Sequence, residues 1–244
     1  MAKGSGLGMG FYISGVDVSG DVGSFGNISG GNSPLLFTGI DKFAFERQGG
    51  KRDGAAAFNT FFNVPGIHAT LKTLPTADAI VTGRIGSTIG FPAFSMTAKQ
   101  LDYNPKRAAD GSLLFDVNTV ANGFGLQWGD LLTAGIRTDT TATNGPGFDT
   151  GAVIGAAGYQ MYVHLLAFTG TSVTIKLQDS DDNGGADPFS DNGATLTFST
   201  APNSGRAIGA PSGLGQFIRV VTTGTFSNAQ FVVMVDTNRT ATVF

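Results

Sequence analysis

Few side chains in this sequence have the type and spacing that catalysis or metal binding requires. The 244 residues include two histidines, His68 and His164, and no cysteine. A multi-histidine or thiolate metal centre and a disulfide framework are therefore excluded. His164 lies in the apolar segment Tyr162–Leu166, which favours a structural strand residue over a general base, and His68 follows Pro65-Gly66 in a predicted turn.

The segment Asp179–Gly184 resembles the first half of a calcium-binding loop. Acids stand at positions 1 and 3, Asn183 at position 5 and Gly184 at position 6. Position 12 is Ser190 where a bidentate glutamate is required, and the flanking segments have the pattern of strands. We therefore predict a polar hairpin loop here, with no bound metal.

No other pattern supplies catalytic machinery. The glycines at 4, 6, 8 and 10 do not match a phosphate-binding loop, because no strand precedes them and no Gly-Lys-Ser/Thr follows. No serine stands in a nucleophile elbow. Sequence alone does not exclude a carboxylate pair at glycosidase spacing, but the acids lie mostly in glycine-rich turns, where solvation explains them. We expect no enzymatic activity, no catalytic residue and no cofactor.

The composition indicates a core-forming protein with an unusually uncharged surface. Hydrophobic residues make up 41%, including 20 phenylalanines, whereas charged residues make up 14% against about 25% in typical domains. Such a surface suits a protein in contact with others. The net charge of −3 argues against a nucleic-acid-coating role. No apolar run has the length of a membrane span, and the N-terminus lacks the apolar core of a signal peptide.

Alternation of apolar residues with period two predicts an all-β chain. Asp53-Gly54 and Asp110-Gly111 are predicted turns, and one short helix is predicted at Pro75–Thr82. The predicted strands are 10–18, 35–47, 55–62, 94–103, 113–120, 159–168, 172–178, 194–199, 217–223 and 231–235.

A shift to Gly, Thr and Asn between Gly123 and Gly158 suggests a domain boundary or an arm that packs on a neighbouring subunit. We therefore divide the chain into a β domain at 1–125, a connection or arm at 126–155, and a second β-sandwich-like domain at 156–244. Two series, one around Phe37-Thr38-Gly39 and one around Phe168-Thr169-Gly170, are faintly alike. They leave open a duplication of the first domain in the second.

Several motifs, taken in order, resemble one family of virion proteins. They are Phe45–Gly54, Ala57–Asn63, Leu74–Asp78, Ala98–Pro105, Asp110–Leu113, Ala121–Gly129, His164–Thr171, Gln178–Gly184 and Phe217–Val220. The series resembles the major tail proteins, or tail tube proteins, of long-tailed bacteriophages of the siphovirus type, especially those of actinobacterial hosts. It spans nearly the whole chain, and its motifs are turns and strands.

The resemblance implies a tail-tube-type β-sandwich or barrel that assembles into rings, which stack into a tube through which DNA is ejected. It implies that the partners are further copies of the chain, the tape measure and tail terminator proteins, and DNA that passes without specific binding. No membrane is involved. The expected location is the virion tail, and the host cytoplasm during assembly. Ile136–Gly151 and the N-terminal arm are the candidates for joining adjacent rings.

The residues leave other roles open. Lys51-Arg52 and Lys106-Arg107 protect strand edges or pair with charges across a subunit interface. A capsid decoration protein would also use small β domains of low charge. A carbohydrate-binding module is the alternative from another class, although the one tryptophan, Trp128, lies in the connection. The resemblance to tail tube proteins implies rings of six chains with the first domain lining the tube, whereas a duplication would favour three.

Overall fold

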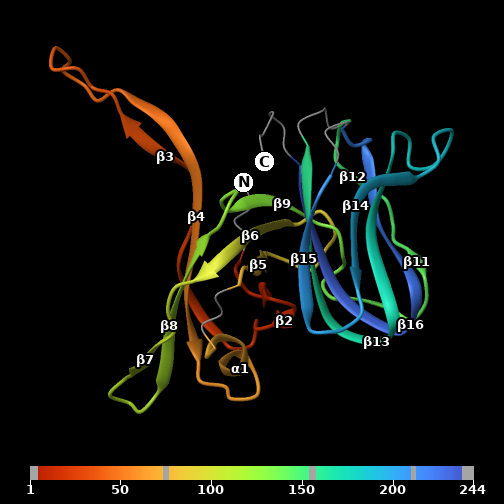
Figure 1. Ribbon diagram of the computed structural model, residues 1–244, viewed down its shortest axis with the longest axis horizontal. Helices are drawn as coiled ribbons and strands as arrows, with labels where there is room; N and C mark the ends of the chain where they lie inside the picture. Colours follow the sequence, from red (N-terminus) through yellow and green to blue (C-terminus); the bar gives the residue numbers. More distant parts are fainter. Residues whose placement is uncertain (1–4, 74–76, 154–157, 210–212, 238–244) are drawn as a thin grey trace. The chain divides into compact units, whose positions relative to one another are not determined.

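The computed structural model describes residues 5–73, 77–153, 158–209 and 213–237 (Figure 1). These residues form strands throughout, with one short helix, as the period-two pattern predicted. They divide into two compact units. Unit 1 comprises Met1–Gly20, Ala79–Ser95 and Trp128–Phe244, and unit 2 comprises Asp21–Asp78 and Met96–Gln127.

This division differs from the predicted domains at 1–125, 126–155 and 156–244. The chain enters and leaves unit 2 twice, because strands from the first half of the sequence complete the sheet of unit 1. The duplicate series also occupy unlike positions. Phe37-Thr38-Gly39 lies at the end of a hairpin, whereas Phe168-Thr169-Gly170 lies within a 22-residue strand.

Unit 2 is an antiparallel sheet built on a long hairpin. Strands β3 (Val22–Leu36) and β4 (Arg47–Phe61) pair along most of their length, and β8 (Leu113–Ala121) pairs with the other side of β4. Beyond β8 lie β7 (Asn104–Arg107) and the end of β6 (Pro92–Gln100).

The helix α1 (Ile67–Leu71) also belongs to unit 2. It buries Ile67 and Leu71, four residues apart on one helical face. The Asp21 carboxylate accepts a hydrogen bond from the Ile67 N–H at 3.0 Å.

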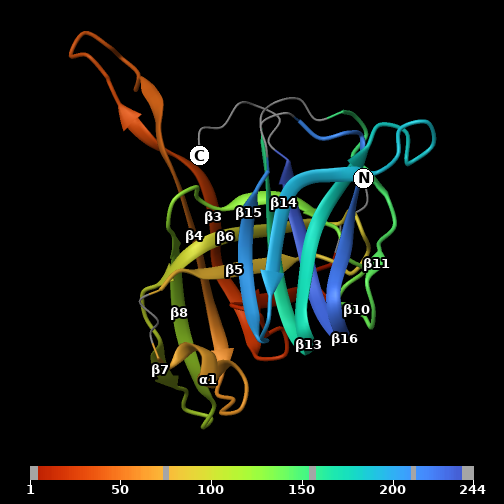
Figure 2. The same cartoon turned by 45° about the vertical axis from the view of Figure 1, so that its right-hand side comes forward.

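Unit 1 contains a sheet with strand order β14-β13-β16-β9-β6-β5-β1-β2. Its longest strands, β13 (Tyr159–Ser180) and β16 (Phe217–Thr237), form one antiparallel pair that runs from Tyr159 opposite Thr237 to Ser180 opposite Phe217. Figure 2 shows them beside β14. The other strands are β1 (Gly10–Ile13), β2 (Val16–Asp17), β5 (Ala79–Arg84), β9 (Gln127–Leu131), β10 (Arg137–Asp139), β11 (Thr143–Asn144), β12 (Phe148–Asp149), β14 (Ser190–Phe198) and β15 (Asn203–Ile208).

The main core of unit 1 follows from alternation along β13. Odd-numbered residues of both its halves, from Tyr159 to Leu165 and from Val173 to Leu177, are fully buried in one cluster. Three register irregularities lie between these halves and let the strand bend. Val220 and Phe231 on the two halves of β16 join the same cluster, so one folded hairpin supplies most of the core.

Three local predictions are wrong. The helix expected at Pro75–Thr82 is not formed at its C-terminal part, because Ala79–Arg84 is strand β5 and pairs its β-branched residues with β1; residues 74–76 lie outside the described part. Asp53-Gly54 is not a turn but lies inside β4, held there by pairing with β3. The strand predicted at 35–47 is mostly the end of the β3–β4 hairpin.

The connection predicted at 126–155 is not a free arm in its described part. Strands β10, β11 and β12 all pair with β16 of the same chain. Arg137 fixes this segment, because its guanidinium binds the Asp139 carboxylate at 2.8 Å and donates to the Val220 carbonyl at 2.9 Å. By contrast, the turn predicted at Asp110-Gly111 is confirmed, with Gly111 at a φ of 92° between β7 and β8.

Candidate assembly surface

The feature of unit 2 that most needs a functional explanation is the outer end of the β3–β4 hairpin (Figure 1). We call residues 35–46 the arm tip. The Phe37 N–H donates to the Glu46 carbonyl at 3.1 Å, and the Lys42 N–H donates to the Gly39 carbonyl at 3.2 Å. The second bond closes a tight turn with Ile40 and Asp41 at its centre.

Glycines let the inner part of the hairpin pack closely against the rest of unit 2. A Cβ on Gly54 would lie 2.3 Å from the Leu126 nitrogen, and one on Gly30 would lie 2.8 Å from the Leu126 carbonyl oxygen. Both distances are too short for any side chain, so the backbone itself makes this contact. The hairpin is therefore anchored at its base, which positions the arm tip.

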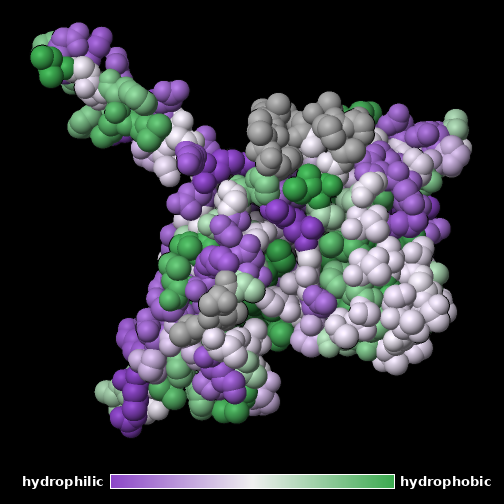
Figure 3. Space-filling view, viewed as in Figure 1, coloured by the Kyte–Doolittle hydropathy of each residue, from purple (hydrophilic) through white to green (hydrophobic). Residues whose placement is uncertain are grey.

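Large apolar side chains crowd the arm tip and stand in solvent (Figure 3). Their exposed fractions run from 46% to 110%, and the residues are Leu35, Leu36, Phe37, Ile40, Phe43 and Phe45. Taking about 200 Å² for the full accessible surface of each such residue, these fractions give roughly 900 Å² of exposed residue surface. The largest apolar patch on a typical monomer is about 300–600 Å².

Polar residues lie beside this surface but leave its apolar side chains exposed. The Arg47 guanidinium lies 5.1 Å from the centre of the Phe45 ring. Lys42 forms ion pairs with Asp41 at 3.9 Å and Glu46 at 3.7 Å, all largely exposed, so they contribute little stability. Ile40 stands at the centre of a turn, where Gly, Asn and Asp are usual.

The sequence contained a signal for this site that the strand interpretation missed. Phe37, Ile40 and Phe43 are spaced by three residues, which does not fit the period of two expected for a strand. The two segments that the sequence favoured for joining subunits belong to unit 1. Ile136–Gly151 packs on β16, and Gly10 begins β1, with residues 1–4 outside the described part.

The predicted polar hairpin loop lies between β13 and β14; Asp179 and Ser180 end β13, and Asp181–Gly184 begin the loop. Its carboxylates hold the loop together. The backbone N–H groups of Gly185, Ala186 and Asp187 donate to Asp182, and the Asp181 N–H donates to Asp187. Although desolvation opposes it, these backbone bonds lower the pKa of Asp182 overall. Among the described residues, no group of three acidic or histidine side chains is arranged to hold a metal ion.

His164 is a structural strand residue, as predicted. It lies fully buried on β13 of unit 1. The Gly15 N–H donates to its Nδ1 at 3.1 Å, so the proton of the neutral ring is on Nε2, which donates to the Thr82 hydroxyl at 2.9 Å. Burial lowers the pKa of His164 to about 3. The ring therefore joins the turn after β1 to β5 and β13.

His68 lies on α1 and not in the predicted turn. Its Nδ1 is 3.0 Å from the Tyr103 hydroxyl, and its ring packs edge-on against Phe62. Burial of the phenol raises the pKa of Tyr103. This aromatic cluster in unit 2 stabilises the end of the sheet near α1.

The remaining candidates are separate from one another. Lys51-Arg52 lies within β4, and Lys106-Arg107 lies on the short edge strand β7. Trp128, the residue that a sugar-binding platform would use, is 52% exposed on β9, with its ring against Phe94 in a T-shaped contact. No helix in the described ranges is long and apolar enough to cross a membrane.

Comparisons with known proteins give two structural likenesses. The chain matches no protein-family model, and no curated protein sequence is similar to it. The crystal structure of the SPP1 Dit (gp 19.1) protein, described as a paradigm of the hub adsorption apparatus in phages that infect Gram-positive hosts, aligns over 93% of this chain and 98% of its own, with 11% identity and a TM-score of 0.34. The phage P2 baseplate in its activated conformation with Ca aligns over 96% and 99%, with 9% identity and a TM-score of 0.30. Values this low assign neither a family nor a function.

Proposed function

We propose that this chain is a structural protein of the tail of a long-tailed bacteriophage, and that it assembles with itself into stacked rings that form the tail tube. The observation that carries the proposal is the arm tip. Its roughly 900 Å² of exposed, largely apolar surface is close to the 800 Å² that each partner contributes to a standard interface. An exposed apolar surface of this size marks a site where a partner binds.

The partner that the chain's properties favour is another copy of itself. The resemblance of the sequence to tail tube proteins supports self-assembly, and so does the low content of charged residues, 14%. In the proposed assembly the arm tip binds a different part of the neighbouring copy. A contact of this heterologous kind generates closed rings or open stacks rather than a simple dimer.

The other roles in the proposal rest on the resemblance. Tape measure and tail terminator proteins are the proposed further partners, and DNA is the cargo that passes through the lumen. The net charge of −3 fits a tube that repels phosphates rather than binding them. The proposed location is the phage tail, after assembly in the host cytoplasm, and the protein has no enzymatic role.

A triple substitution in the arm tip tests the proposal. Phe37→Ser, Ile40→Ser and Phe43→Ser remove three exposed apolar side chains that no described core cluster contains. A matched control carries Ile136→Ser, Val153→Ser and Ile208→Ser, three exposed apolar positions of unit 1. Sedimentation velocity and negative-stain electron microscopy should show rings or tubes for the wild type and the control, and monomers for the arm-tip variant.

Two results would contradict the proposal. A wild type that stays monomeric up to high concentration while its arm tip is intact would exclude self-assembly. An arm-tip variant that assembles as well as the control would show that the tip has another partner. Binding of wild-type monomers to purified capsids would favour the decoration-protein alternative, and binding to a glycan array would favour the carbohydrate-binding one.

A further inference from the structure

The sequence contains two Asp-Gly pairs, Asp53-Gly54 and Asp110-Gly111. In such a pair the glycine nitrogen can attack Cγ of the aspartate and close a five-membered succinimide ring, because glycine has no Cβ to shield its backbone. Both pairs belong to unit 2, and both aspartates are exposed. A difference in reactivity between the two pairs should therefore come from their local contacts.

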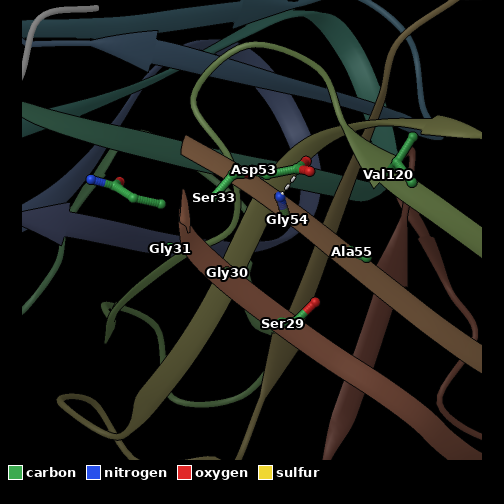
Figure 4. Close-up of a pocket in the computed structure, with 9 residues that line it drawn as sticks. Ser29, Gly30, Gly31, Ser33, Asp53, Gly54, Ala55 and Val120 are labelled. Carbon is green, nitrogen blue, oxygen red and sulfur yellow. Dashed lines mark hydrogen bonds between the residues drawn. The ribbon is translucent and has the colours of Figure 1, made fainter. Parts of the chain in front are cut away.

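The carboxylate of Asp53 lies against the nitrogen that would attack it. Its Oδ1 accepts a hydrogen bond from the Gly54 N–H at 2.8 Å, the dashed bond in Figure 4. Cγ is bonded to this oxygen, so the carbon that must react already lies beside the nitrogen. Holding two reacting groups together in this way lowers the barrier, because the entropy of bringing them together is lost in advance.

The carboxylate of Asp110 is turned away from its glycine. Its Oδ1 accepts hydrogen bonds from the Ser112 N–H at 2.9 Å and from the Ser112 hydroxyl at 2.8 Å. These two bonds lower the pKa of Asp110 and keep its carboxyl ionised, the form that does not release water. The Gly111 N–H is occupied as well, since it donates to the Ala108 carbonyl at 3.1 Å.

Water reaches Asp53 through an open groove of about 220 Å³ (Figure 4). Residues 29–33 of β3, residues 53–55 of β4 and Val120 of β8 line it. Gly31, which lies opposite Asp53, has open space where a Cβ would stand. It therefore places no side chain over the carboxylate, and the solvent that must open a succinimide has access to it.

Asn-Gly pairs would react through the same ring, and they begin at Asn122, Asn144, Asn183 and Asn192. In each of them, either the glycine N–H or the asparagine amide donates to another residue. Asn203 has its Oδ1 on the Ser204 N–H at 2.8 Å, but serine carries the side chain that glycine lacks. Asp53-Gly54 thus combines the contact with an unshielded nitrogen.

We propose that Asp53 is a modification site, at which the folded chain converts aspartate spontaneously to isoaspartate. The Gly54 nitrogen bonds to Cγ of the protonated carboxyl, and the amide proton and the carboxyl hydroxyl leave together as water. A second water then opens the succinimide at one of its two carbonyls, which restores aspartate or gives isoaspartate. The net mass is unchanged, and the reaction needs neither an oxidant nor self-assembly of the chain.

Isoaspartate would disturb the hairpin that carries the arm tip. The main chain then runs through the side-chain methylene, so β4 gains one backbone atom between Arg52 and Gly54. Its backbone is closely packed here: Gly54 lies against Leu126, and a Cβ on Gly125 would lie 2.6 Å from the Asp53 carbonyl oxygen. We therefore expect converted chains to unfold at a lower urea concentration than unconverted ones.

Ageing of the folded and the unfolded chain tests the proposal. Wild-type protein is kept in neutral buffer with and without guanidinium chloride, then digested with endoproteinase Asp-N, which cleaves before aspartate but not before isoaspartate. Mass spectrometry of the separated peptides follows both positions. In the folded protein, isoaspartate should form at position 53 at least about 10-fold faster than at position 110. In guanidinium chloride, where neither set of contacts persists, the two rates should be similar.

Asp53→Glu is the matched variant, because it keeps the charge but would have to close a six-membered ring. It should lose the uncleaved peptide at position 53, whereas deamidation elsewhere is recognised by its change in mass. Equal rates at positions 53 and 110 of the folded protein would overturn the inference. Isoaspartate at position 53 in guanidinium chloride but not in the folded protein would also overturn it, because β4 would then protect the pair.

Discussion

Burial of His164 makes the stability of unit 1 depend on pH. The folded ring is neutral, with a pKa lowered from 6.5 to about 3, and the cause is its complete burial. Above pH 6.5 the ring is neutral in both states and adds no pH dependence. As the pH falls below 6.5 the unfolded chain binds a proton that the folded chain does not, so the free energy of unfolding decreases until the folded ring is protonated near pH 3.

The magnitude follows from the distance between the pH and the ordinary pKa. Each pH unit below 6.5 costs about 1.4 kcal/mol, so the free energy of unfolding should fall by about 2 kcal/mol between pH 7 and pH 5 through this residue alone. The interval from pH 7 to pH 5 lies above the ordinary pKa values of Asp and Glu. Carboxyl groups therefore contribute little to the change in the free energy of unfolding over this interval.

Urea unfolding followed by Trp128 fluorescence measures this effect, because the single tryptophan of the chain lies in the same unit as His164. His164→Gln keeps an acceptor and a donor on the side chain but does not titrate. It should lower stability at pH 7 by about 1–3 kcal/mol and remove most of the loss between pH 7 and pH 5. His68→Gln is the control for the loss of one histidine. The reasoning would be refuted if the free energy of unfolding of His164→Gln kept the wild-type pH dependence. It would also be refuted if His68→Gln were the variant that lost this pH dependence.

Three further predictions concern stability. Gly83→Ala should destabilise unit 1 by about 1–3 kcal/mol, because the added Cβ would lie 2.3 Å from the Phe94 ring, whereas Gly20→Ala has nothing within 4 Å; equal urea midpoints for the two variants would contradict this. A chelator should shift the melting temperature by less than about 4 °C, because backbone N–H groups already occupy the Asp182 carboxylate; a larger fall would reveal a bound metal. The Phe37→Ser, Ile40→Ser, Phe43→Ser variant should unfold as a monomer within about 0.5 kcal/mol of the wild-type monomer, and a larger loss would place these side chains in the folding core.

The parts of the fold that the sequence predicted are those in which one face of a strand is buried. Leu113–Val120 alternates between core and solvent and corresponds to β8. Phe94–Tyr103 corresponds to β6, which ends at Gln100 and buries the consecutive residues Ala93–Met96. Tyr159–Phe168 and Ser172–Gln178 were also predicted as strands, but in the structure they are the two halves of β13. The sequence did not show this, because the residues between them are as typical of a hairpin turn as of a bend within one strand.

The parts that the sequence could not predict depend on partners distant in the chain. Asp53-Gly54 has the composition of a turn, but pairing with β3 and contact with Leu126 hold it in β4. The Pro75–Thr82 segment has helical signals, but Ile80 and Val81 are buried in β5. The arm tip was missed because its apolar residues were assigned to a core. Local sequence does not distinguish a side chain buried in its own unit from one that awaits a neighbour.

The mass of the particles formed by the purified protein tests the central claim, self-assembly into rings, most directly. Native mass spectrometry or mass photometry on wild-type protein should detect a ring of six chains, about 150 kDa from the chain mass of 25.1 kDa, and the arm-tip variant should give 25.1 kDa alone. A ring of three chains, about 75 kDa from the same chain mass, would support assembly but contradict the six-fold ring. A wild-type protein found only at 25.1 kDa over the whole concentration range would contradict the account.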